Sequence, residues 1–255
     1  MKLTTFVAVL AAGSLSLTPA LAHDLWVNAH VVEPAGVEAE IGYGHDYPRA
    51  ETIEKGRVHL FEPLKLVGEG SVATLRQVGE NYRYAGSGVD NPGTYFVVAE
   101  YRPTYWSKNQ KGWAQQNRTE MKDAEYCTLA TMYGKRVLTL GEATGEDFVA
   151  RPLGHKLEII PLQHPVAYKV DKPFRVKILF DGKPLKTTPV TATYAGYLPN
   201  ASAFYGHTDL RGEIDILPLR AGQWLVQVKH ATDHHNPAVC DQESYAATLT
   251  FDIER

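Results

Sequence analysis

The residues of this chain best suited to chemistry are its histidines, which number 10 against only 2 cysteines. His23 follows Ala20-Leu21-Ala22, a small-residue pattern that predicts signal-peptidase cleavage after Ala22. Cleavage there would give His23 a free α-amine beside its ring Nδ1. An amine of pKa about 8 and an imidazole of pKa about 6.5 can both lose their protons to a metal near neutral pH. Such nitrogens suit copper, nickel and zinc, so we predict a metal ligand at His23.

A hairpin expected after His23 brings further candidate ligands to it. The alternating runs 23–32 and 37–46 flank a turn that contains Pro and Gly, which predicts two paired strands. The two registers that such a turn allows place His23 opposite either Asp46 or His45. Directly paired Cβ atoms lie about 5 Å apart, so one ion could be shared. We predict His45 and Asp46 as ligands; the alternative for His45 is a turn residue hydrogen-bonded to Asp46.

A second group of histidines lies near the end of the sequence, at 230–235. If the run at 213–217 forms a hairpin with the strand that Trp224 opens, the pairing places His207 beside Asp233. The alternative is a solvated polar loop. A closed metal site needs three or four ligands, so at least one must come from outside the first hairpin. The candidates in this group are His207, His230 and His234, with His235 next to them.

The two cysteines predict a disulfide. Cys127 and Cys240 form an even pair in a chain expected to be exported into an oxidising compartment. Neither has the C-x-x-C spacing of a metal site. The bond would tie the middle of the chain to its end.

The elements that must position these residues read as strands. Many short alternating or β-branched runs separated by turn residues predict an all-β fold of two β-sandwich domains. We place the boundary near 145–154, which gives a signal peptide at 1–22, an N-terminal sandwich at 23–150 and a C-terminal one at 151–255. The best helical candidate is the segment 119–132. No stretch beyond the signal peptide is long and apolar enough to span a membrane.

The C-terminal half carries a pattern typical of Ig-like or transthyretin-like sandwiches. Asp209 and Gly212 stand in a T-D-x-x-G sequence that predicts a tight turn. Trp224 follows in a G-x-W sequence and is expected to fill the core between the sheets. This pattern indicates fold and says nothing of function.

Charge and missing motifs exclude several classes of function. The 255 residues carry a formal net charge of −3, which argues against a nucleic-acid partner. The sequence has no G-x-S-x-G and no H-E-x-x-H motif, so we expect no hydrolase and, more broadly, no enzyme.

Several motifs are spread along the whole mature chain. They are Ala22-His23-Asp24-Leu25-Trp26, Gly44-His45-Asp46-Tyr47-Pro48, Tyr105-Trp106-Ser107-Lys108, Thr208-Asp209-Leu210-Arg211-Gly212 and Gly222-Gln223-Trp224. Together they resemble a bacterial periplasmic family of unknown domain function linked to nickel uptake, which includes the additional periplasmic component of energy-coupling-factor nickel transporters. The resemblance implies a periplasmic protein that captures Ni²⁺, with copper, cobalt and zinc as alternatives, and passes it to a membrane metal permease. His23 and His45 match the N-terminal His and the G-H motif of that family.

Two other classes of function remain open. A copper-dependent oxidative enzyme of the histidine-brace type also begins with His, and could use the aromatic Tyr105, Trp106 and Trp113. A non-catalytic adhesion or scaffold module would suit the second sandwich.

Overall fold

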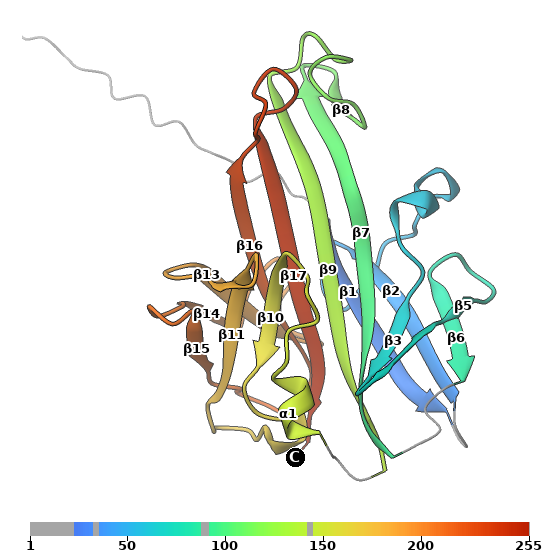
Figure 1. Cartoon of the computed structure of the whole chain (residues 1–255), viewed down its shortest axis with the longest axis vertical. Coiled ribbons are helices and arrows are strands. Elements are labelled where there is room, and N and C mark those ends of the chain that lie inside the picture. Colours follow the sequence, from blue (N-terminus) through green and yellow to red (C-terminus); the bar gives the residue numbers. More distant parts are fainter. Residues whose placement is uncertain (1–22, 33–35, 88–91, 142–144, 255) are drawn as a thin grey trace, which may run out of the picture.

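Three β-sheets build the part of the chain described by the computed structural model, residues 23–32, 36–87, 92–141 and 145–254 (Figure 1). The all-β prediction is confirmed. The expected signal peptide at 1–22 lies outside the described residues.

The largest sheet runs through the middle of the molecule and contains strands from both halves of the sequence. Its order is β14-β13-β16-β17-β9-β7-β3-β4, with β8 paired to β7. The step from β17 to β9 is parallel, while the other pairs are antiparallel. Its strands are β3 (Lys65–Gly68), β4 (Ser71–Thr74), β7 (Gly93–Asn109), β8 (Gly112–Ala114), β9 (Tyr126–Leu140), β13 (Pro189–Tyr194), β14 (Phe204–His207), β16 (Gly222–Asp233) and β17 (Gln242–Ile253).

Two smaller sheets cover this central sheet. The first has the order β1-β2-β6-β5, from β1 (Asp24–Val32), β2 (Gly36–Gly44), β5 (Arg76–Gln77) and β6 (Arg83–Ser87). The second pairs β11 with β10, β12 and β15, from β10 (Leu157–Pro161), β11 (Phe174–Phe180), β12 (Lys183–Pro184) and β15 (Glu213–Ile216). The described helices are short: η1 (Lys55–Leu60), α1 (Glu146–Val149) and η2 (Pro165–Ala167). None of them is long and apolar enough to cross a membrane.

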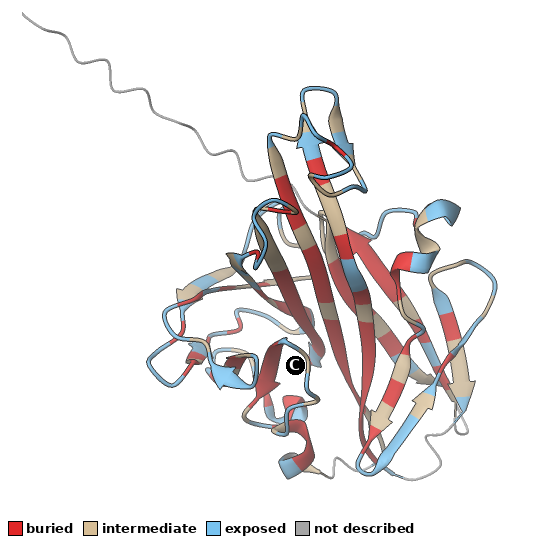
Figure 2. Ribbon diagram, turned by 45° about the horizontal axis from the view of Figure 1, so that its top comes forward, coloured by how far each residue is buried: buried red, intermediate tan, exposed pale blue. Residues whose placement is uncertain are grey.

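The two small sheets lie on opposite faces of the central sheet, so two sandwiches share one layer. Side chains alternate along a strand, and in β7 Val97 belongs to the core under the first sheet while Phe96 and Val98 belong to the other core. Figure 2 shows the resulting buried stripes along the long strands. Trp224 is fully buried in the second core, as expected. The predicted boundary near residue 150 falls between β9 and β10, next to α1.

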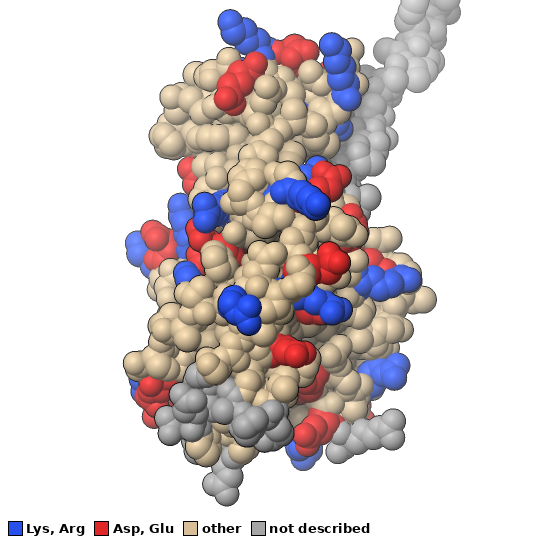
Figure 3. All heavy atoms as spheres, turned by 90° about the vertical axis from the view of Figure 1, so that its right-hand side faces the viewer, with Lys and Arg blue, Asp and Glu red and all other residues tan. Residues whose placement is uncertain are grey.

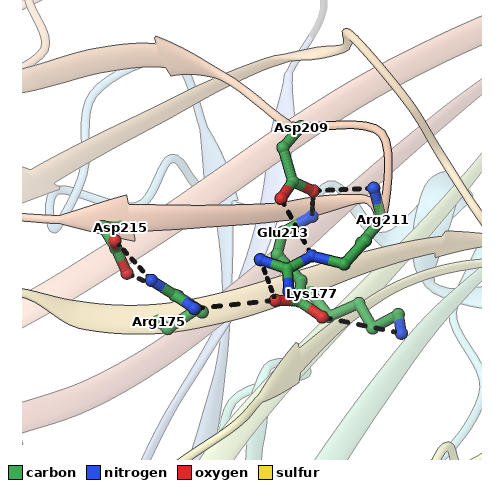
Figure 4. A network of polar contacts seen from close by, with 6 residues as sticks. All are labelled: Arg175, Lys177, Asp209, Arg211, Glu213 and Asp215. Carbon is green, nitrogen blue, oxygen red and sulfur yellow. Dashed lines mark hydrogen bonds and ion pairs between the residues drawn. The ribbon is translucent and has the colours of Figure 1, made fainter.

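The T-D-x-x-G turn has the predicted local geometry but a different strand partner. The Asp209 carboxylate accepts the backbone N–H groups of Arg211 and Glu213, at 2.8 and 2.9 Å, and Gly212 has a positive φ of 75°. The turn joins β14 to β15, and β15 pairs with β11 and not with β16, so the expected hairpin between 213–217 and the Trp224 strand is wrong. Figure 4 shows the exposed ion pairs on this face, with Arg175 bound by both oxygens of Asp215 at 2.7 Å.

The disulfide prediction is confirmed, and the helix prediction is wrong. Cys127 and Cys240 are bonded. The second half of the segment 119–132 belongs to β9, which begins at Tyr126 and lies between β7 and β17. The pairing of β9 with two strands outweighs a weak helical pattern, because local propensity is small beside tertiary contacts.

Candidate metal centre

The register of the β1–β2 hairpin brings the first two residues of the candidate site together. Its register runs from Asp24↔Gly44 to Val32↔Gly36, so the next pair at the open end is His23 with His45. This is the second of the two registers that the sequence allows, and the one that would face His23 with Asp46 is wrong. The imidazole rings of His23 and His45 lie with centroids 4.2 Å apart.

Glu51 completes the cluster. One carboxylate oxygen lies 2.9 Å from His23 Nε2 and the other 2.5 Å from His45 Nδ1. The chain turns back after β2, so that Glu51 N–H donates to the carbonyl of Tyr43 at 2.8 Å. A Cβ on Gly44 would lie only 3.2 Å from Glu51 Cγ, so glycine there gives this side chain room. His23, His45 and Glu51 each offer one ligand atom, and all three atoms lie within 4.8 Å of one another.

Hydrogen bonds from β17 hold β1 against the central sheet. The Thr248 hydroxyl donates to the carbonyl of Leu25 at 2.7 Å, and the Thr250 hydroxyl to that of Val27 at 2.5 Å. Both threonines are buried. These bonds hold the start of β1, and therefore the neighbouring His23, against β17.

A stack of aromatic rings packs against the His23 imidazole. Its ring lies parallel to Tyr43 at 4.5 Å, and Tyr43 is stacked on Tyr101 at 6.0 Å. Trp106 Nε1 donates to the Tyr101 hydroxyl at 3.0 Å. Burial raises the pKa of the Tyr43 phenol, which therefore stays protonated.

The electrostatics favour a neutral imidazole beside an ionised carboxylate. Burial lowers the pKa of His23, and the nearby His45 lowers it further, against the hydrogen bond to Glu51 that raises it. The hydrogen bond from His45 lowers the pKa of Glu51. A neutral ring offers a lone pair, and the side chains of His23, His45 and Glu51 are 26, 29 and 49% exposed, so an ion can reach them.

Asp46, the acid predicted in this place, is used elsewhere. Its carboxylate binds the Arg49 guanidinium, with Nε at 3.0 Å, and its carbonyl accepts Arg49 N–H at 2.7 Å. With His45 it lines a pocket of about 220 Å³ next to the cluster. The sequence signal for Glu51 was the turn at 46–49, which reverses the chain and returns the next acid to the end of β2.

The structure separates the second predicted group. His207 lies on β14 beside Tyr205, whose hydroxyl is 3.3 Å from its Nε2. His230 packs edge-on against Phe180 at 4.5 Å. Neither residue belongs to the second group of side chains whose possible ligand atoms lie close together. That group consists of His234, His235 and Glu243. Glu243 was missed because it lies on β17, and Glu51 because it lies in the segment that turns back after β2.

Charge of both signs is spread over one face of the molecule. On the face in Figure 3, Lys and Arg alternate with Asp and Glu and form no broad patch of one sign.

Comparisons with known proteins add a family but no activity. The model of a family described as a domain of unknown function (DUF4198) matches residues 20–232. No curated protein matches the sequence. Among solved structures, the D0-D1 domain of intimin is similar with 15% identity and a TM-score of 0.22, covering 89% of this chain and 97% of that one. The D00-D0 domain of intimin has 11% identity and a TM-score of 0.23, covering 91% and 100%. The family description mentions no nickel uptake.

Proposed function

The chain belongs to the DUF4198 family, and on the cluster of His23, His45 and Glu51 we propose that it captures a divalent transition-metal ion. The observation that carries this proposal is the convergence of two imidazoles and one carboxylate within 4.8 Å. Two nitrogen ligands and one oxygen ligand suit nickel, copper, cobalt or zinc, and an open position remains.

In this proposal the chain is exported and non-catalytic. Cleavage after Ala22 would free the His23 amine, and this nitrogen would join the three side chains on one ion. The protein would then hold Ni²⁺ or a related cation in the periplasm and release it to a membrane metal permease. Partly exposed ligands are consistent with a cargo that must leave again.

Titration of the metal-free mature protein with Ni²⁺, Cu²⁺ and Zn²⁺ tests the site. Glu51→Gln keeps the size of the side chain and removes its charge, so the affinity of this site should fall about 100-fold, or about 2.7 kcal/mol. Asp46→Asn is the matched control, because Asp46 binds Arg49, and its affinity should equal that of the unchanged protein. Equal losses in the two variants would refute the assigned ligand set.

The amine needs a separate test. One extra Ala before His23 leaves all three side chains in place but moves the terminal nitrogen, so the affinity should fall. If it stays the same while Glu51→Gln weakens binding, the ion is held by side chains alone. If none of the three metals binds at all, a scaffold role would replace metal capture.

A copper-dependent oxidation is the second candidate function, favoured by the stack of His23, Tyr43 and Tyr101 that ends at Trp106. Aromatic rings at these distances could carry an oxidising equivalent away from the histidines. Copper-loaded protein should then consume peroxide with a reductant, and Tyr43→Phe should change the rate. The absence of turnover would leave the capture role.

A further inference from the structure

A second cluster of ligand groups lies far along the chain from the first, at the end of β16 and the start of β17. His234, His235 and Glu243 each offer one ligand atom, and these atoms lie within 4.8 Å of one another. His235 Nδ1 is 3.6 Å from Glu243 Oε1, and the two imidazole rings have centroids 4.3 Å apart. None of these residues belongs to the His23 cluster.

The buried member of this cluster is held in a fixed orientation. His234 is only 4% exposed, and its Nδ1 lies 2.9 Å from the carbonyl oxygen of Asn236. The backbone N–H of Asn236 lies 3.1 Å from the same nitrogen and donates to it when the ring proton is on Nε2. When the proton is on Nδ1, the carbonyl accepts it, and Nε2 then presents its lone pair. The Tyr105 hydroxyl lies 3.3 Å from Nε2. A backbone acceptor on one ring nitrogen is the usual way to fix a metal-binding histidine.

Glu243 is oriented in a similar way. The Tyr245 hydroxyl donates to Oε2, and the Lys156 ammonium lies 3.5 Å from the same oxygen. The other oxygen, Oε1, faces His235. One carboxylate oxygen is thus held by the protein while the other is turned towards the imidazoles, as in ligating carboxylates with hydrogen-bonded support.

A disulfide and an ion pair hold the loop between β16 and β17 in place. The Cys127–Cys240 disulfide ties it to β9, and both oxygens of Asp241 accept from Arg118, at 2.7 and 2.6 Å. Asp241 also accepts the backbone N–H of Cys127 at 2.7 Å. Figure 1 shows this loop at the end of the long strands, beside the ends of β7 and β9. These bonds hold the loop in place before any ion binds.

We propose that His234, His235 and Glu243 form a second site, which binds a divalent ion of the nickel, copper and zinc group. Two nitrogens and one oxygen are the ligands that these ions take, and three protein ligands leave a position for water or an exchanging group. The argument uses no residue of the first site, so it stands whether or not that site is correct.

The stoichiometry of Zn²⁺ binding to the mature, disulfide-bonded protein tests this. We expect two equivalents in the unchanged protein and one in either His235→Ala or Glu243→Gln, with the His23-site affinity unaltered. His45→Ala should lose the other equivalent, and the double variant His45→Ala/His235→Ala both. His235 is 79% exposed, so removing it does not threaten the fold.

His30→Ala is the matched control, because the exposed His30 side chain also faces an exposed glutamate, Glu38, at 3.5 Å. It should keep two equivalents. Removal of the disulfide in Cys127→Ala/Cys240→Ala should weaken the second site at least tenfold and leave the first unchanged. The proposal is overturned if His235→Ala and Glu243→Gln both bind as much Zn²⁺ as the unchanged protein.

Discussion

At the residue scale, a glutamate supplies the charge in each candidate site. Glu51 contacts His23 with one oxygen and His45 with the other, so a single side chain aligns both rings. The carboxylate also adds a negative charge, which neutral imidazoles lack and which attracts a divalent cation. Asp46 is not part of this cluster, and its Oδ2 accepts from both Nε and an Nη of Arg49.

His155 gives a pH-dependence that can be measured without any metal. Burial, and then the charge of Lys135, lower its pKa to about 4, against the opposite effects of Glu158 and Glu100. Below pH 6.5 the unfolded chain binds this proton and the folded chain does not, so stability falls as the pH drops from about 6.5 to 4. The loss is about 3 kcal/mol.

Denaturant unfolding of the His155→Phe variant tests whether His155 causes this pH-dependence of stability. Phenylalanine can keep the stacking on Tyr133, whose ring lies 4.7 Å away, and cannot titrate. The free energy of unfolding should therefore depend less on pH between 6.5 and 4. The exposed His59→Phe is the control and should keep the original slope. Equal slopes in all three proteins would show that His155 is not the source.

The two missed glutamates show what residue types alone can predict. His23 and His45 could be found because the hairpin places them at one end, whatever the exact register. Residue types alone do not reveal Glu51 and Glu243. The turn at 46–49 returns Glu51 to the end of β2, and the pairing of β16 with β17 sets the position of Glu243.

At the scale of elements, the β1–β2 hairpin follows from its alternation, while its close packing depends on one glycine. A Cβ on Gly42 would lie 1.9 Å from Trp26 Nε1, so the buried indole occupies the space that a side chain would need. The alternation of 23–32 and 37–46 predicts the two strands. It does not predict that the indole lies across the neighbouring strand.

Gly42→Ala should therefore disturb the hairpin and the first site together. We expect a loss of about 1–3 kcal/mol in the free energy of unfolding, as for an overpacked core, and weaker metal binding at His23. Gly56→Ala is the control, since a Cβ there meets nothing within 4 Å. Thermal unfolding and metal titration of both variants measure this; an unchanged Gly42→Ala protein would contradict the packing.

At the scale of the whole molecule, one sheet joins what the sequence presents as two sandwiches. The parallel pairing of β17 with β9, from Gln242↔Thr128 to Thr250↔Arg136, brings the last strand back to the middle of the chain. The predicted sandwiches follow from local alternation and turns. This long-range pairing does not, because the same alternating strand can pair with many partners.

The shared sheet predicts a single cooperative unfolding transition. Lys135 on β9 and Glu158 on β10 form a fully buried ion pair, 2.8 Å apart, that joins the central sheet to the layer above it. Glu158 also accepts the backbone N–H groups of Leu153 and Gly154. Burial raises the pKa of Glu158, but the charge and hydrogen bond of Lys135 outweigh this and leave it lowered, so the carboxylate is ionised.

Glu158→Gln leaves the Lys135 charge buried without a counter-ion, which costs about 3–5 kcal/mol. Because both sandwiches contain β9, this loss should lower the temperature of one common transition, with calorimetric and van't Hoff enthalpies equal before and after the change. Arg175→Gln breaks an exposed pair and should leave the transition temperature almost unchanged. Two separate transitions, of which Glu158→Gln shifts only one, would show that the sandwiches unfold independently although they share a sheet.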